Sequence, residues 1–148
     1  MDYILEGMIC VIRKNVNNFI IKRAHKRCQD YYWSNHNGYK ESEEKFFDLY
    51  NRKRLILDVC ILKINKYCVN IEIGLNSLFR IESAIDFLCE YIFKSDRKVQ
   101  LIFTYIVSRD FLGRYIFRQS GFRCGVIKRS AIRIQEKEYN LEVYVRYR

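Results

Sequence analysis

Residues 113–129 read GRYIFRQSGFRCGVIKR and predict a helix that ends at a glycine and is followed by a strand. The chain holds six glycines, and two of them, Gly121 and Gly125, stand close together in this stretch. A glycine just beyond a helix adopts the left-handed conformation without a steric penalty from Cβ, so Gly121 is the expected helix end. We expect Phe122 to pack back on the helix and Gly125 to mark a bulge in the strand.

The residues before and after this stretch alternate between helical and strand-like patterns. Asp110 is a good N-cap for the helix 111–120, and Ser42 is a plausible N-cap for a helix that ends near Asn51 and turns Phe46, Phe47, Leu49 and Tyr50 inward. The other expected helices are 16–32 and 83–93, and the expected strands are 6–13, 55–64, 67–75, 99–107, 125–134 and 139–147. The order β α α β β α β α β β predicts an α/β fold with a mixed sheet, in a single domain spanning residues 1–148.

Composition and charge limit the class of protein. Hydrophobic residues make up 49% and aromatic residues 16% of the chain, which excludes a disordered linker. The net charge of +10, from 27 basic and 17 acidic residues, favours an anionic partner such as nucleic acid or a phosphate-bearing cofactor. The alternative is a Lys-rich surface that serves solubility alone.

The sequence contains no pattern typical of a membrane segment, a signal peptide or a metal site. No apolar run approaches the roughly 20 residues that span a bilayer, and acidic Asp2 and Glu6 at the N-terminus do not fit a signal peptide. The six cysteines are scattered singly without metal-ligand spacing. They read as free thiols in a reducing cytoplasm, with a disulfide set as the alternative.

Several motifs, taken in order, carry a family resemblance. LEGMICVIRKN (5–15) is followed by a strand ending in Glu72-Ile73-Gly74, a helix 84–93, an apolar strand, Gly121-Phe122, and the strand start GVIKR (125–129). This order and spacing resembles the GNAT superfamily of acetyl-CoA-dependent N-acetyltransferases, and looks closest to the branch that modifies ribosomal-protein N-termini.

The resemblance implies a twisted mixed sheet with helices on both faces. Two central strands, 71–75 and 101–107, are expected to splay apart near Asn76 and Ser108 within one sheet. Residues 51–75 hold two strands where relatives usually fit three, which leaves room for a sheet one strand short on its N-terminal side. The resemblance also implies acetyl-CoA as cofactor and a primary amine of a protein or small molecule as acceptor.

The resemblance also assigns site residues. Glu72 would act as a base on the amine, with a strand carboxylate paired to Arg or Lys as the alternative. Tyr115 would donate a proton to the leaving thiolate only with a shifted helix register, because Phe117 and Gly113 stand where relatives carry a Tyr or a Ser. The implied cofactor-binding residues are Leu75, Asn76, Arg80, Ile81, Glu82, Ser83, Arg109 and Asp110.

The expected pyrophosphate loop departs from the family pattern. Relatives have glycines that let backbone N–H groups close on the anion, whereas residues 80–84 read RIESA and the loop is shorter. Glu82 would place a carboxylate beside the phosphates. The sequence therefore predicts weak acetyl-CoA binding and weak or lost catalysis.

A second class of function stays open. Lys22, Arg23, Lys26 and Arg27, followed by Tyr31, Tyr32 and Trp33, are suited to phosphate contacts and base stacking. The chain would then be a non-catalytic basic module for RNA or a ribonucleoprotein. The alternative for these residues is a solvated helix face.

Overall fold

The computed structural model describes residues 3–5, 8–12, 44–51 and 53–148. The predicted helix 16–32 and the basic, aromatic set around it lie outside these ranges. The described elements, in chain order, are β1 Tyr3–Leu5, β2 Met8–Ile12, β3 Glu44–Asn51, β4 Arg54–Lys63, β5 Cys68–Leu75, α2 Ile81–Ser95, β6 Leu101–Val107, α3 Phe111–Gln119, β7 Arg123–Ile134 and β8 Lys137–Tyr147.

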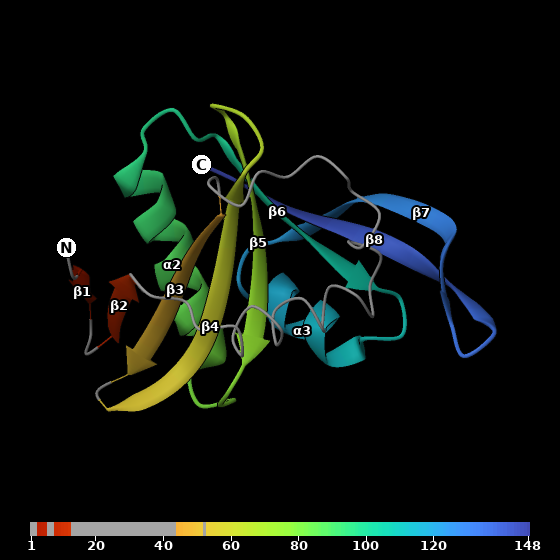
Figure 1. Ribbon diagram of the computed structural model, residues 1–148, viewed down its shortest axis with the longest axis horizontal. Helices are drawn as coiled ribbons and strands as arrows, with labels where there is room; N and C mark the ends of the chain where they lie inside the picture. Colours follow the sequence, from red (N-terminus) through yellow and green to blue (C-terminus); the bar gives the residue numbers. More distant parts are fainter. Residues whose placement is uncertain (1–2, 6–7, 13–43, 52) are drawn as a thin grey trace.

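The described strands form one mixed sheet in the order β1-β2-β3-β4-β5-β6-β8-β7. Neighbouring strands are antiparallel except β5 and β6, which are parallel and pair only from Cys68↔Leu101 to Asn70↔Phe103. Figure 1 shows these two strands side by side at the top of the view and diverging downward, with α3 between their lower ends. The predicted α/β mixed sheet is confirmed, and so is the splay of its two central strands.

Strand β3 overturns one prediction. Residues 42–51 were expected to form a helix, but Glu44–Asn51 is a strand that pairs with β2 on one side and β4 on the other. Ladders to two neighbours satisfy the backbone along its length and outweigh the local N-cap signal at Ser42. Leu49 is fully buried in the core. With β3 as a strand, the N-terminal side of the sheet is not one strand short.

The expected strands 55–64 and 67–75, and likewise 125–134 and 139–147, pair as two antiparallel hairpins. In the β4–β5 turn the side chain of Asn65 accepts a hydrogen bond from Tyr67 N at 2.8 Å. In the β7–β8 turn the central residues Gln135 and Glu136 have φ of 48° and 65°. Two consecutive positive φ values are typical of the two-residue turns that match the twist of antiparallel strands.

The main core lies between the sheet and the helices α2 and α3. Alternate residues of β5, namely Val69, Ile71 and Ile73, are buried in one cluster with apolar residues of α2 and α3. Because side chains alternate along a strand, Asn70, Glu72 and Gly74 face the other side of the sheet. The two described helices therefore cover the same face, and the opposite face carries the polar residues of β5.

The stretch 113–129 is arranged as predicted. Gly121 has φ of +82° just after α3, and Phe122 packs edge-on against Phe117 with ring centroids 5.0 Å apart. The β7–β8 register shifts between Cys124 and Val126, which places Gly125 in a bulge. The two glycines therefore serve the helix end and the bulge.

Two arginines of β8 and its end fasten this strand to α2. Arg146 donates hydrogen bonds to Asp86 at 2.7 Å and Glu90 at 3.3 Å on α2, and to the carbonyl of Ser120 at 2.9 Å. Arg148 donates to the carbonyl oxygens of Phe93, Asp96 and Val99 at 2.6–2.9 Å. A cation at these carbonyls suits the negative end of the helix dipole. Side chains thus connect α2 to the half of the sheet that follows it.

Candidate functional site

The site is an opening between β5 and β6. No residue pair joins the two strands beyond Asn70 and Phe103 in the described sheet. The end of β5 is held toward β4 instead, because Asn76 N and Ser77 N both donate to the carbonyl of Ile56, at 3.0 and 3.3 Å. The carboxyl ends of these two central, parallel strands therefore separate, and α/β proteins commonly bind ligands beyond such strand ends.

A buried carboxylate fixes the β5 side of the opening. Asp58 on β4 is 8% exposed and lies opposite Gly74 in the register. A Cβ at Gly74 would lie 2.5 Å from Asp58 Cγ, so this glycine leaves the space that the carboxylate fills. The Asn76 side-chain amide donates to Asp58 Oδ1 and to the carbonyl of Gly74. The three residues hold the end of β5 in one position.

The N-terminus of α2 borders the same opening. Arg80 precedes the helix with φ of 52°, and its side chain makes no capping hydrogen bond. Ile81 N donates to Leu78 O at 3.4 Å and Ala84 N to Arg80 O at 3.0 Å, whereas the N–H groups of Glu82 and Ser83 have no acceptor among the described residues. Two free N–H groups at the positive end of a helix are suited to an anion such as a phosphate.

The N-terminus of α3 lies at the end of β6. Asp110 caps it as predicted, because its carboxylate accepts a hydrogen bond from Gly113 N at 2.9 Å. A Cβ at Gly113 would lie 2.5 Å from Asp110 Oδ2, so the missing side chain makes room for the cap. Arg109 is exposed, with its guanidinium 5.2 Å from the ring centroid of Tyr139. Arg109 thus supplies an exposed cation just after the end of β6.

The predicted cofactor residues follow the two separating strands. Leu75 and Asn76 end β5, and Arg109 and Asp110 follow β6. Arg80 directly precedes α2, but residues 81–83 form its first turn, so the connecting loop comprises Asn76–Arg80 and lies before the segment that was expected to hold the phosphates. The side chain of Ile81 is buried in the core.

The two predicted catalytic residues are not brought together. Glu72 is half-buried on the face opposite α2, across from Cys60 of β4. Tyr115 is 57% exposed on the outer side of α3, while Phe117 is buried at 8%. The helix therefore turns Phe117 toward the core and leaves the Tyr115 ring on its exposed side.

Asp58 was missed by sequence reasoning. It lies in the middle of the expected strand 55–64, LILDVCILKI. A lone carboxylate in such an apolar strand was the available signal, because a buried carboxylate needs a partner. That partner, Asn76, lies 18 positions away in the chain.

Three further features of the described residues concern membrane helices, metal sites and cysteines. No described helix is long and apolar enough to cross a membrane. The described part of the chain holds no group of three or more His, Cys, Asp or Glu side chains suited to a metal ion. Cys60, Cys68, Cys89 and Cys124 are free thiols.

Comparison with known proteins adds structural likeness only. No protein-family model and no curated protein matches the sequence. Among solved structures, spermidine N-acetyltransferase from Vibrio cholerae, in complex with CoA and spermine, has a TM-score of 0.73. Its sequence is 12% identical, and the match covers 95% of each chain.

Two ribosomal-protein acetyltransferases are similar in the same way. The RimL ribosomal L7/L12 alpha-N-protein acetyltransferase, in complex with coenzyme A, has a TM-score of 0.68 and 7% identity, over 98% of this chain and 96% of that one. The ribosomal-protein-S5-alanine acetyltransferase from Vibrio fischeri has a TM-score of 0.66 and 12% identity, over 99% and 96%. This chain therefore has the fold of the GNAT N-acetyltransferases.

Proposed function

We propose that residues 1–148 act as a single domain that transfers the acetyl group of acetyl-CoA to a primary amine of a protein or small molecule. One observation carries the proposal. The parallel strands β5 and β6 separate beyond Asn70 and Phe103, and the separated ends lie beside a helix N-terminus with two free N–H groups. The similar solved structures that contain CoA support the choice of cofactor.

The residues at α2 would hold the cofactor's phosphates. The N–H groups of Glu82 and Ser83 would donate to them, and the cations of Arg80 and Arg109 would reduce their charge. The Glu82 carboxylate, in the first turn of α2, opposes the same charge. We therefore expect acetyl-CoA to bind, and to bind weakly.

Glu72 is the proposed base. Acetyl-CoA, when bound, supplies the acetyl group as an activated thioester. The Glu72 carboxylate faces the side of the sheet away from α2, from which an amine would approach the opening, and it would accept the amine proton directly or through a water. Backbone N–H groups at the separated end of β5 would polarise the thioester carbonyl.

Tyr115 remains a predicted proton donor to the leaving thiolate. Its exposed position on α3 makes a direct test simple, because Tyr115→Phe removes only the hydroxyl. A general acid contributes roughly 10²–10⁴-fold to the rate. An unchanged turnover rate for Tyr115→Phe would contradict the role.

The decisive experiment is calorimetric titration with acetyl-CoA. We expect saturable binding to the unmodified protein and binding about two- to fivefold tighter for Glu82→Gln, because removing one exposed like charge is worth up to about 1 kcal/mol. The control is Glu136→Gln, which removes the same charge from the exposed β7–β8 turn and should leave affinity unchanged. Absence of binding in both the unmodified protein and Glu82→Gln would overturn the proposal.

Activity is measured with spermine and with a peptide that has a free N-terminal amine. Glu72→Gln should lower turnover at neutral pH more than it lowers acetyl-CoA affinity, because it removes the base and keeps the shape. We also propose a reducing compartment such as the cytoplasm, supported by the free thiols of Cys60, Cys68, Cys89 and Cys124.

A further inference from the structure

Strand β7 forms one edge of the described sheet and pairs with β8 alone. Its register shifts between Cys124 and Val126 and again between Lys128 and Ile132. Residues Val126–Arg129, which follow the first irregularity and run into the second, form the edge segment. An unpaired strand edge presents N–H and C=O groups that can pair with another extended chain.

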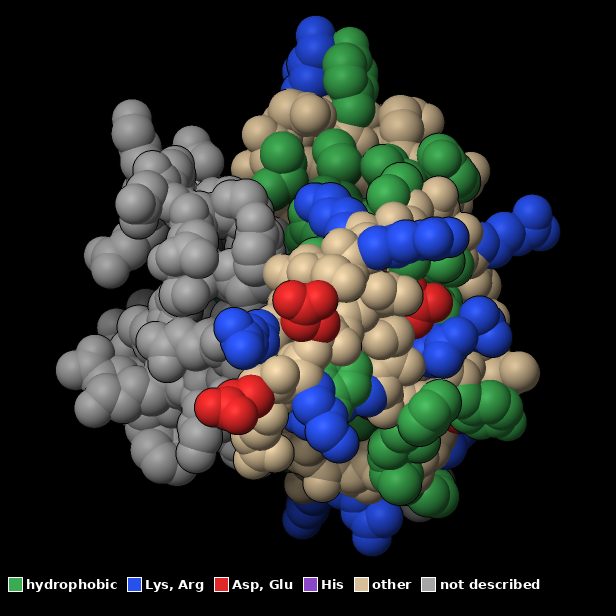
Figure 2. Space-filling view, turned by 90° about the vertical axis from the view of Figure 1, so that its right-hand side faces the viewer, with side chains coloured by type: hydrophobic (Ala, Val, Ile, Leu, Met, Phe, Trp, Pro, Cys, Tyr) green, Lys and Arg blue, Asp and Glu red, His purple; other side chains and the backbone are tan. Residues whose placement is uncertain are grey.

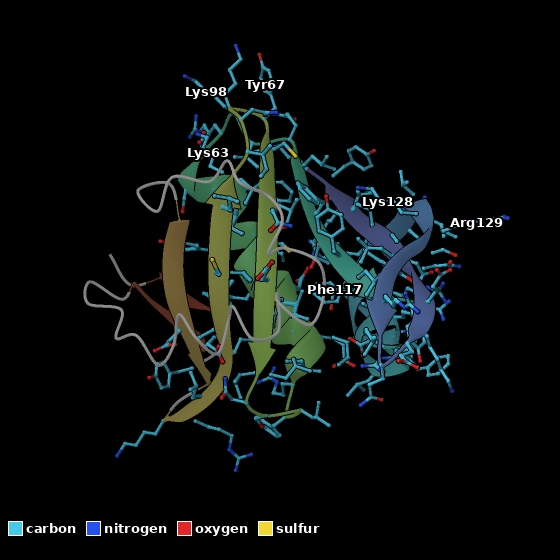
Figure 3. All side chains as sticks on the ribbon, turned by 45° about the vertical axis from the view of Figure 1, so that its right-hand side comes forward. Lys63, Tyr67, Lys98, Phe117, Lys128 and Arg129 are labelled. Atoms are coloured by element: carbon cyan, nitrogen blue, oxygen red, sulfur yellow. The ribbon has the colours of Figure 1, made fainter. Side chains whose placement is uncertain are left out.

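The edge segment carries apolar and basic side chains in the open. Val126 and Ile127 are each 54% exposed, and Lys128 and Arg129 are exposed as well. Neither basic residue takes part in an ion pair with a described residue. Figure 3 shows Arg129 pointing away from the sheet at the hairpin.

The positive charge extends beyond the edge segment. β7 contains four basic residues, Arg123, Lys128, Arg129 and Arg133, and no acidic one. Figure 2, which looks onto this side of the molecule, shows many more Lys and Arg side chains than acidic ones, with apolar side chains between them. The surface therefore attracts acidic partners in preference to basic ones.

Lys128 links the edge segment to the opening. Its ammonium lies 5.4 Å from the ring centroid of Tyr105, on strand β6. β6 is the strand that separates from β5 at the proposed site. A chain bound along β7 would thus lie on the same half of the sheet as one wall of the opening.

We propose that the edge segment binds an extended acidic stretch of the protein that carries the acceptor amine. Strand addition would satisfy the backbone of both chains, acidic side chains would pair with Lys128 and Arg129, and small apolar ones would cover Val126 and Ile127. The identification of this polypeptide as the acceptor rests on the proposed function, whereas the binding surface does not.

The charge and composition of β7 favour this occupant over two others. A second copy of the chain would bring β7, with four basic residues and no acidic one, against an identical strand, and the two positive strands would repel each other. Single-stranded RNA favours exposed aromatic side chains for stacking beside the cations, and β7 contains no aromatic residue. An acidic, extended polypeptide would complement the positive charge of β7 and would pair with its unpaired backbone edge.

The test is fluorescence anisotropy without acetyl-CoA. The probe is a synthetic peptide as long as β7, in which Glu alternates with Val or Ala, labelled at its C-terminus. We expect Lys128→Glu with Arg129→Glu to weaken binding about tenfold or more, because each change turns an attraction into a repulsion. The control pair, Lys66→Glu with Lys98→Glu, makes the same charge change on exposed residues of the β4–β5 turn and the α2–β6 loop.

Figure 3 places Lys98, beside Tyr67, at the end of the sheet away from Lys128 and Arg129. We therefore expect the control pair to change affinity less than twofold. An equal loss in both pairs would show that only net charge matters and would overturn the proposal. So would equal binding of a peptide with Lys in place of Glu.

Two further probes complete the test. A Glu peptide with N-methylated backbone amides should bind at least fivefold more weakly, and undiminished binding would overturn strand addition. Oligouridylate RNA should bind more weakly than the Glu peptide, and tighter RNA binding that depends on Lys128 and Arg129 would overturn the proposal in favour of nucleic acid. Acetyl-CoA titration of the same variants separates this surface from the proposed function, since neither residue contacts the opening's helix N-terminus.

Discussion

Replacing Gly74 by alanine is a direct test of how the end of β5 is held. The new Cβ would lie 2.5 Å from Asp58 Cγ, whereas ordinary contacts are 3.4–4 Å, so the carboxylate must move by about 1 Å. That movement breaks its hydrogen bond with Asn76, and a hydrogen bond to a charged group is worth about 1.5–3 kcal/mol. Glycine in a strand costs about 0.5–1 kcal/mol relative to alanine, so the net loss is about 1–2 kcal/mol.

The same change should have the opposite sign once the carboxylate is gone. In an Asp58→Ala background the space beside Gly74 is free, and Gly74→Ala should stabilise by about 0.5–1 kcal/mol through the strand preference alone. The coupling between the two sites is then about 1.5–3 kcal/mol, within the range for residues in contact.

The assay is urea unfolding followed by circular dichroism on the two single variants, the double variant and the unmodified protein. The control is Gly125→Ala, because a Cβ there would lie at 3.4 Å from the nearest atom, Val145 Cγ2, so this change should not lower stability by more than about 0.5 kcal/mol. A Gly74→Ala effect of the same sign and size in both backgrounds would refute the reasoning.

Three further outcomes follow from described contacts. Gly121→Ala should lower the free energy of unfolding by about 1–2 kcal/mol, because φ of +82° is costly for a residue with Cβ; chemical unfolding measures this, and an unchanged midpoint would contradict it. Arg146→Met keeps the apolar stem but loses bonds to Asp86 and Glu90, so thermal unfolding should show a loss of about 1.5–3 kcal/mol at low salt, and no loss would show that these pairs are not stabilising. Burial raises the pKa of Cys89 to about 12, so at pH 8 iodoacetamide should alkylate it only after unfolding, and rapid labelling of the native protein, seen by peptide mass spectrometry, would contradict this.

Much of the fold was predictable from local signals. Asn65 marks a turn between two strands, Asp110 supplies a side-chain cap, and Gly121 allows a left-handed helix end, so each position constrains its own neighbourhood. The order of these signals along the chain predicted the mixed sheet, and the resemblance to the GNAT superfamily predicted its splayed strands.

The prediction failed where the structure depends on distant partners. Residues 44–51 carry a helix-like start, but their strand state is set by β2 and β4, which no local pattern reveals. Asp58 and Gly74 face one another only after β4 and β5 pair. The free N–H groups of Glu82 and Ser83 likewise depend on the backbone turn at Arg80, which sequence reasoning placed inside the phosphate loop.

The short ladder between β5 and β6 has a mechanical consequence. Among the described residues, the strand pairs that join the half-sheet β1–β5 to the half-sheet β6, β8 and β7 run from Cys68↔Leu101 to Asn70↔Phe103, at one end of both strands. The two half-sheets are therefore joined at one end of the β5–β6 seam and separate at the other. Hydrogen bonds of Arg146 and Arg148 hold α2 to the half-sheet that contains β8. A force that pulls the two half-sheets apart has its greatest leverage where β5 and β6 are already separated. Mechanical unfolding should therefore begin at the β5–β6 ladder, while the antiparallel ladders on either side stay paired.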